Sequence, residues 1–282
     1  MKLKFFTTLV YMISILKITA QSGYSLELNV NTIPTEEITK NETGIGISFY
    51  SNLDSKNKIT NSINYKNSGL KFNLDNYYSA DNKNNYNRIE NNLEFKHQLN
   101  EKVGLDFEFK TIAAFENSLD FSDVGFFGGA GIQYSYSEKS SIYLGIKRNT
   151  LLGKAEVLPA IAFNSKLNAK TDLTVGFPYS KIQYSNNERN VFSLKNTFNG
   201  EYYQLDQTKT ISSNLSASRM SFSQMTTALE YERNVDGNWF MSFQGGYQFN
   251  KKYRLTDNRG TTKFNFDAND GYLLNIGIKY KP

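Results

Sequence analysis

The sequence of 282 residues contains no cysteine and only one histidine, one tryptophan and four prolines. The absence of cysteine excludes a disulfide framework and thiolate metal sites. Because His97 is the single histidine, metal sites built from several histidines are excluded as well. The mean hydropathy of −0.52 excludes a bundle of membrane-spanning helices, since each would need about 20 apolar residues.

Aromatic residues and apolar–polar alternation are abundant in this chain. It contains 19 tyrosines and 21 phenylalanines. From residue 21 onward the apolar residues recur mainly at every second position, which indicates β-strands rather than helices. A membrane β-barrel can be as polar as this chain, because only alternate residues of each strand face lipid.

The first 20 residues have the pattern of a secretory signal peptide. Lys2 and Lys4 give a positive start, and residues 5–16 form a mainly apolar run of 12 that is too short to span a bilayer as a helix. We expect cleavage between Ala20 and Gln21. Removing three lysines with this segment leaves 29 basic residues against 27 acidic ones. The basic character of the full chain therefore does not indicate nucleic-acid binding.

Residues 271–282 show the clearest strand pattern. The apolar face holds every second residue: Tyr272, Leu274, Ile276, Ile278 and Tyr280. Aliphatic side chains between amphipathic rings are typical of a membrane-crossing strand, with the rings at the two water boundaries. Trp239 and Phe249 bound a second strand of this kind, and we assign all four aromatic end residues to the membrane interface. On this stretch alone, the edge strand of a soluble β-sandwich is the alternative.

The connections between the predicted strands alternate in length. Short turns are predicted at residues 66–69, 100–102, 137–140, 167–171, 199–200 and 234–238. Longer polar connections are predicted at residues 79–87, 116–123, 179–190 and 251–270. Outer-membrane barrels have short turns at one end and longer loops at the other, whereas a soluble sandwich gives no reason for such alternation. The sequence therefore predicts an all-β chain folded as an antiparallel transmembrane β-barrel.

The strand count depends on how the weaker segments are treated. Asn199-Gly200 is taken as a hairpin turn, because this dipeptide is a strong hairpin signal. Counting from Gly44 with the alternation of turns then gives about 14 strands, or about 12 if weak strands are merged. This count divides the chain into a signal peptide (1–20), an N-terminal extension with one weak strand (21–43) and the barrel (44–282).

Several stretches also resemble a known protein family. They are Leu158-Pro159-Ala160-Ile161, residues 176–180 (Gly-Phe-Pro-Tyr-Ser) followed by Tyr184, and the terminal strand. Together with the alternating strands they are similar to an uncharacterised outer-membrane β-barrel family of Gram-negative bacteria, a domain-of-unknown-function group. This resemblance implies the fold and an outer-membrane location, but no activity and no site residues. The terminal strand, which ends near Tyr280, also resembles the signal that the barrel-assembly machinery reads.

The sequence gives little support for catalysis. Some membrane barrels hydrolyse lipid with a serine and a histidine, and the nucleophile then needs its base within hydrogen-bond reach. His97 shares the outward parity of Phe95 and Leu99, so we expect an interfacial histidine near a turn. No cofactor, metal site or nucleic-acid partner is expected, and we predict that the protein is not an enzyme.

Charged residues lie on the strand faces opposite the apolar ones, so we expect them to line the lumen. They are Asp106, Glu108, Lys110, Lys147, Glu156, Lys195, Glu230 and Glu232. Paired carboxylates such as Asp106 and Glu108 are also compatible with acid–base catalysis or a cation site, but a hydrated lumen with mixed charges is the simpler interpretation.

These expectations favour a narrow pore for small solutes in the lipid of the outer membrane. A barrel of about 14 strands falls between filled barrels of about 8 strands and open porins of about 16. A closed structural or binding barrel that acts through its outer loops is the alternative. A lipid-modifying enzyme is a third possibility, which the isolated histidine disfavours.

Overall fold

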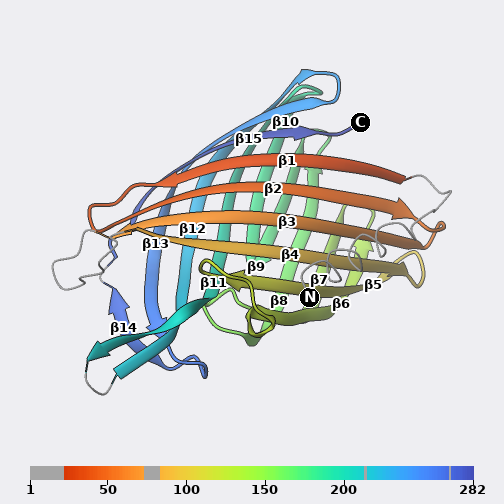
Figure 1. Cartoon of the computed structure of the whole chain (residues 1–282). Coiled ribbons are helices and arrows are strands. Elements are labelled where there is room, and N and C mark those ends of the chain that lie inside the picture. Colours follow the sequence, from red (N-terminus) through yellow and green to blue (C-terminus); the bar gives the residue numbers. More distant parts are fainter. Residues whose placement is uncertain (1–21, 73–82, 213–214, 267) are drawn as a thin grey trace.

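The computed structural model describes residues 22–72, 83–212, 215–266 and 268–282 (Figure 1). The predicted signal peptide lies outside these residues. In the described part, strands dominate, and no helix is both long and apolar enough to span a membrane. The elements are β1 (Ser22–Ile33), β2 (Ile38–Asn52), β3 (Asn57–Phe72), β4 (Lys83–Gln98), β5 (Val103–Phe115), the 3-10 turn η1 (Phe121–Asp123), β6 (Val124–Ser137), β7 (Ser140–Asn149), β8 (Glu156–Asn168), β9 (Thr171–Phe177), β10 (Tyr179–Asn187), β11 (Asn190–Ser212), β12 (Leu215–Asp236), β13 (Trp239–Thr256), β14 (Thr262–Phe266) and β15 (Gly271–Tyr280).

The strands close into a ring. From β1 to β13 each strand pairs with the next one in the chain, and β15 pairs with both β13 and β1. Among the described strands β14 pairs only with the far end of β13 and lies outside the ring, so the ring has fourteen strands. Closure leaves no open strand edge in the ring, which a sheet in lipid requires because its backbone groups cannot bond to water there. The prediction of an all-β, antiparallel transmembrane barrel with 14 strands is confirmed.

The two ends of the barrel differ. One end, here called the turn end, carries the tight connections at residues 53–56, 99–102, 138–139, 169–170, 188–189 and 237–238. The opposite end, the loop end, carries the longer connections at residues 34–37, 116–123, 150–155 and 257–270. Strands β11, β12 and β13 are the longest described strands and extend furthest toward the loop end, where Figure 1 also shows β14.

The structure corrects several boundaries that the sequence suggested. Residues 66–69 lie inside β3 and residues 199–200 lie inside β11, so neither is a turn. Residues 179–187, predicted as part of a long connection, form β10. The first two errors share a cause: these strands run past the hydrocarbon layer toward the loop end, where both faces are polar and a turn-like composition no longer marks a turn.

The segment 21–43 is not an extension of the barrel. Ser22–Ile33 is β1, which pairs with β2 and closes the ring by pairing with β15, for example Leu28 with Ile278. The next strand, β2, begins at Ile38 rather than at Gly44. The predicted number of strands was right because two errors cancelled: β1 had been left out of the barrel and β10 had been missed, whereas β3 and β11 had each been counted as two strands.

The outer face of the barrel is an apolar band with aromatic edges. Trp239 pairs with Tyr280, and their ring centroids are 4.9 Å apart; Tyr247 pairs with Tyr272, at 5.5 Å. The two pairs are eight residues apart on each strand, about 27 Å of strand, or about 21 Å of height at a tilt of about 40°. This height is comparable to the apolar band of about 25 Å in membrane barrels. Phe249, two residues beyond Tyr247, is half-buried.

A charge in the middle of this band should destabilise the barrel. Ile276 is 52 % exposed and lies midway between Tyr272 and Tyr280 on the outer face. We expect Ile276→Arg to lower the free energy of unfolding by about 2–4 kcal/mol, the cost of arginine at the bilayer midplane. Urea titration of the refolded protein in lipid vesicles measures this difference. The matched control is Gln244→Arg, at the same depth on the lumenal face and beside Glu230, where a change below about 1 kcal/mol is expected. Equal effects of the two substitutions would contradict this assignment of faces.

Candidate functional site

Charged side chains of opposite sign pair along the inner face of the barrel. Glu108 Oε2 lies 2.6 Å from Lys147 Nζ, and Glu108 Oε1 lies 3.3 Å from Lys110 Nζ. The Lys195 and Glu230 side chains are 2.5 Å apart. The lumen is thus lined by ion pairs of balanced charge.

The other lumen candidates lie toward the ends of the barrel. Asp106 pairs with Lys96 at 3.6 Å, near the turn end. At the same end, Glu232 lies 3.5 Å from the Lys279 side chain. Glu156 begins β8 at the loop end, where it lies 3.3 Å from Lys154. The candidate residues therefore form several separate pairs and do not converge on one site.

A second network crosses the lumen nearer the loop end. Lys40 of β2 lies 2.8 Å from Glu42 and 3.6 Å from Glu201 of β11, and Lys66 of β3 contacts both carboxylates. In the fourteen-strand ring β2 is five strands from β11 and β3 is six strands from it, so β11 faces β2 and β3 across the barrel. At this level two lysines and two glutamates therefore bridge the lumen, and Lys40 is only 3 % exposed.

None of the four residues of this bridging network was among the lumenal residues predicted from the sequence. Lys40 and Glu42 fell in the segment assigned to the N-terminal extension, and Lys66 fell in a predicted turn. Glu201 follows the Asn199-Gly200 pair that was taken as a hairpin. One signal was available in the sequence. Lys40, Glu42, Gly44 and Gly46 occupy every second position, and four successive polar or small residues on one face of a strand predict that this face is lumenal.

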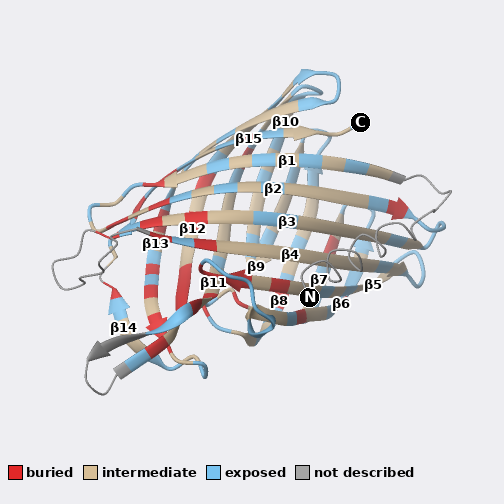
Figure 2. Cartoon of the chain, in the orientation of Figure 1, coloured by how far each residue is buried: buried red, intermediate tan, exposed pale blue. Residues whose placement is uncertain are grey.

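Above this network, aromatic side chains close the loop end of the lumen. Tyr86, Tyr203, Phe222 and Tyr253 are all almost completely buried. The Tyr86 and Tyr203 rings are 5.0 Å apart, and the Phe222 and Tyr253 rings are 4.9 Å apart. These four residues and the aliphatic residues packed around them, such as Ile112, form one cluster, here called the cap. Figure 2 shows the buried positions gathered toward the loop end of the barrel.

Two of the cap aromatics belong to a hairpin that folds across the loop end. The hairpin consists of residues 199–212 of β11 and 215–222 of β12, here called the lid. Gln204 of the lid pairs in parallel with Phe115 of β5. In the ring β5 is six strands from β11, almost diametrically opposite. The lid therefore reaches from its own wall to the far wall and covers the lumen.

Hydrogen bonds fasten the lid to the connection after β5. The Glu116 backbone N–H donates to the Gln204 carbonyl oxygen at 3.1 Å. Asn117 and Ser118 both donate to the Asp206 carboxylate, with side-chain distances of 3.1 Å each. The slight desolvation of Asp206 would raise its pKa, but these hydrogen bonds outweigh it and hold the pKa below the ordinary aspartate value. The carboxylate is therefore charged at neutral pH and keeps the lid fastened.

Gly200 lets the connection between β7 and β8 approach the lid. A Cβ atom at this position would lie 2.3 Å from the backbone oxygens of Thr150 and Leu151, a distance that no side chain can adopt. Thr150 Oγ1 donates to the Gly200 carbonyl oxygen at 2.9 Å, and Ser221 Oγ donates to the Gly153 carbonyl oxygen at 2.5 Å. The Asn199-Gly200 pair thus serves close packing of backbone and not a hairpin turn.

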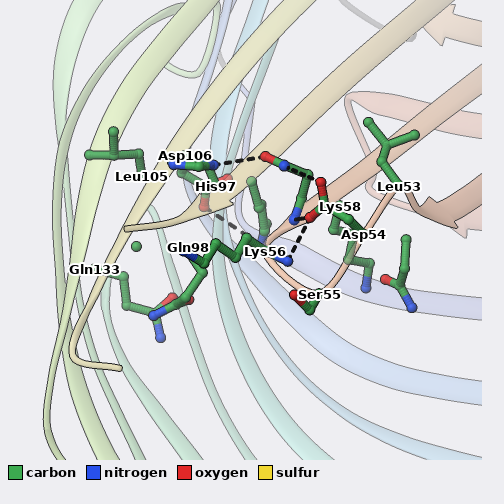
Figure 3. Close-up of a pocket in the computed structure, with 14 residues that line it drawn as sticks. Leu53, Asp54, Ser55, Lys56, Lys58, His97, Gln98, Leu105, Asp106 and Gln133 are labelled. Atoms are coloured by element: carbon green, nitrogen blue, oxygen red, sulfur yellow. Dashed lines mark hydrogen bonds and ion pairs between the residues drawn. The ribbon is translucent and has the colours of Figure 1, made fainter. Parts of the chain in front are cut away.

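At the turn end lies a cavity of 640 Å³, shown in Figure 3. Asp54 in the turn between β2 and β3 accepts hydrogen bonds from the Lys56 and Asn57 backbone N–H groups at 2.7 and 2.8 Å. His97 lies at the rim, with Nδ1 2.7 Å from Asn57 Oδ1 and its ring stacked on Phe95. Within the described residues no group of three or more histidine, aspartate or glutamate side chains could hold a metal ion.

The chain matches the model of a family described as a domain of unknown function, DUF6268, over residues 16–281. This protein therefore belongs to that family, which supports the resemblance inferred from the sequence. No curated protein matches the chain.

Solved structures to which this chain is similar include a FadL homologue, a transporter and a porin. A Pseudomonas aeruginosa FadL homologue has a TM-score of 0.46 at 8 % identity, covering 92 % of this chain and 89 % of that one. The Pseudomonas putida toluene transporter TodX has a TM-score of 0.44 at 9 % identity, with coverage of 92 % and 89 %. The KdgM porin in complex with disordered oligogalacturonate has a TM-score of 0.39 at 7 % identity, with coverage of 90 % and 98 %. These similarities are too distant to transfer a substrate to this chain.

Proposed function

We propose that this protein is a narrow pore of the outer membrane that passes small polar solutes and that the lid closes its outer mouth. The observation that carries the proposal is the structure of the lumen, which is lined by paired charges and covered at the loop end by the lid. The turn end faces the periplasm and the loop end faces outward, as in outer-membrane barrels generally.

The packing of the lid sets how often such a pore would be open. Lifting the lid would expose the rings of Tyr203 and Phe222, each worth roughly 1.5–3 kcal/mol of burial. Together they would hold the open fraction between about one in two hundred and one in thirty thousand. Planar-bilayer recording of the refolded wild-type protein should therefore show rare, brief conductance steps. A folded barrel that stays silent, both as wild type and after Asp206→Ala has removed the fastening carboxylate, would refute the pore.

The paired charges of the lumen should set its ion selectivity. Glu108→Gln leaves Lys147 without its carboxylate partner, so we expect anions to be favoured severalfold over the wild type. Lys110→Gln should shift the selectivity toward cations, because Glu90 and Glu108 each lose an ammonium neighbour. The reversal potential across a salt gradient measures both shifts. Shifts of the same sign in the two variants, or none, would show that these side chains do not line the ion path.

The bridging network and the cap favour a second candidate, a closed barrel that acts through its outer surface. Lys40, Lys66, Glu42 and Glu201 cross the lumen, and the cap above them is fully packed. A closed barrel predicts no conductance in any lid variant, whereas the gated pore predicts conductance that depends on the lid.

Assembly is part of this proposal. We propose that the barrel lies in outer-membrane lipid after removal of the signal peptide near Ala20, and that the barrel-assembly machinery recognises β15 with its terminal Tyr280. Membrane fractionation with a heat-modifiable gel shift tests the location. Recovery in the soluble fraction with no shift on boiling would refute it.

A further inference from the structure

Below the cap lies a polar chamber of 210 Å³, lined by residues of β1, β2, β3, β11, β12, β13 and β15. Its wall includes Asn31, Gln224, Gln248 and Asn275, and its roof includes the ring of Phe222. A second chamber of 430 Å³ adjoins it toward the turn end and shares Asn31 and Asn275 with it. The size of the two chambers suits a small molecule, since ligand pockets commonly measure about 300–1,000 Å³.

Three amide oxygens in this wall have no hydrogen-bond partner within the part of the chain that the structure describes. They are Asn31 Oδ1, Gln224 Oε1 and Gln248 Oε1, and each of these atoms is buried. Gln248 as a whole is only 2 % exposed. The orientation of Asn31 is fixed, because its amide nitrogen donates to Glu42 Oε2 at 2.8 Å and its oxygen therefore points away. Buried acceptors without donors are costly, so three of them in one chamber indicate a ligand that supplies hydroxyl or amine hydrogens.

The charges around the chamber restrict the ligand to a neutral molecule. Lys40 and Lys66 line the wall, and their ammonium groups disfavour a metal ion or an organic cation. Glu42 and Glu201 line it as well and disfavour an anion. The two lysines and two glutamates already pair with each other, so no charge of either sign is left to bind an ion.

We propose that the chamber under the cap is a binding site for a neutral polyhydroxylated molecule about the size of a monosaccharide. Hydroxyl groups of the ligand donate to the three amide oxygens, and the C–H face of its ring or chain packs against Phe222. The inference rests on the proposed function in that the bound molecule is the solute that the pore passes.

Calorimetry and saturation-transfer NMR on the detergent-solubilised, folded protein test the site. The probes are a panel of neutral hexoses and hexitols, including glucose, galactose, mannose and mannitol, with glucosamine and gluconate as charged counterparts. We expect at least one neutral probe to bind and neither charged compound to bind as tightly. The same titration is run on Asp206→Ala, so that a closed lid cannot hide the site.

The variants that locate the site are Gln224→Leu and Gln248→Leu. Each removes one acceptor while keeping the side chain's size, and each should weaken binding about fivefold, the loss of one hydrogen bond. The control is Gln133→Leu, which changes an amide at the turn-end cavity and should leave binding unchanged. A heat-modifiable gel shift confirms that each variant is folded, and Gln224→Met or Gln248→Met, which also lacks the amide oxygen, replaces a leucine variant at the same position that is not.

Three results would overturn the proposal. They are no binding of any neutral probe to the wild type or to Asp206→Ala, equal binding of the charged compounds, or binding that Gln224→Leu and Gln248→Leu leave unchanged. Binding does not depend on conduction, so the two proposals fail separately. If the protein binds a neutral probe but never conducts, the pore is refuted and the binding site stands. If the protein conducts but binds no neutral probe, the binding site is refuted and the pore stands.

Discussion

A disulfide between the lid and the opposite wall is expected to abolish conductance until it is reduced. Phe115→Cys on β5 and Gln204→Cys on the lid place the two cysteines at paired positions of neighbouring strands. The Cα atoms of paired strands lie about 4.8 Å apart, within the range of about 4.4–6.8 Å that disulfides adopt. Because the chain has no cysteine of its own, this is the one disulfide that the variant can form.

The expected effect is large because the disulfide removes the open state entirely. Noncovalent packing leaves the lid open in a small fraction of molecules, whereas a covalent link across the mouth leaves none. The two single-cysteine variants serve as controls for the loss of the Phe115 ring and the Gln204 amide. Both should conduct with or without reductant, and a gel under non-reducing conditions shows how much of the double variant is linked.

Glu42→Leu is expected to cause the largest loss of stability. The Glu42 carboxylate pairs with Lys40 and Lys66 and accepts hydrogen bonds from Asn31 and Ser68. Its removal leaves the almost completely buried Lys40 with one remaining carboxylate, that of Glu201, at 3.6 Å. Breaking a buried ion pair by removing one partner costs about 3–5 kcal/mol, so the urea midpoint in lipid vesicles should fall markedly.

Glu27→Leu provides the matched control for this substitution. Glu27 is also a lumenal glutamate, but its pair with Lys279 is 3.7 Å long and more exposed. A pair of this kind is worth about 0–1 kcal/mol, so the control should be nearly as stable as the wild type. Equal losses in the two variants would mean that the bridging network carries no special share of the stability.

The sequence was sufficient to predict the barrel but not its closure at the loop end. Alternation along β15, from Tyr272 to Tyr280, follows directly from lipid on one face and a lumen on the other. The lid depends instead on a contact between Gln204 and Phe115, which are far apart in the chain and show no shared pattern. Such a contact arises from the length of β11 beyond the membrane, and the Asn199-Gly200 pair hid that length by its resemblance to a turn.

The candidate site was predicted in part for a similar reason. Glu108, Lys147, Lys195 and Glu230 could be placed on lumenal faces, because their strands alternate regularly within the membrane. The chamber under the cap could not be predicted, since a single glutamine such as Gln248 does not reveal whether its oxygen will find a donor. That question is decided by the packing of several strands and the lid, which the spacing of residues along one strand does not encode.

The most direct test of the gated pore is single-channel recording of Phe115→Cys/Gln204→Cys, first oxidised and then after reductant is added to the same bilayer. We predict no conductance steps from the linked protein and rare, brief steps that appear on reduction and match those of the wild type. Steps of the same size and frequency before and after reduction would contradict it, because the lid would then lie outside the path of the ions. Silence in both states, together with a silent wild type, would contradict it as well and would favour the closed barrel.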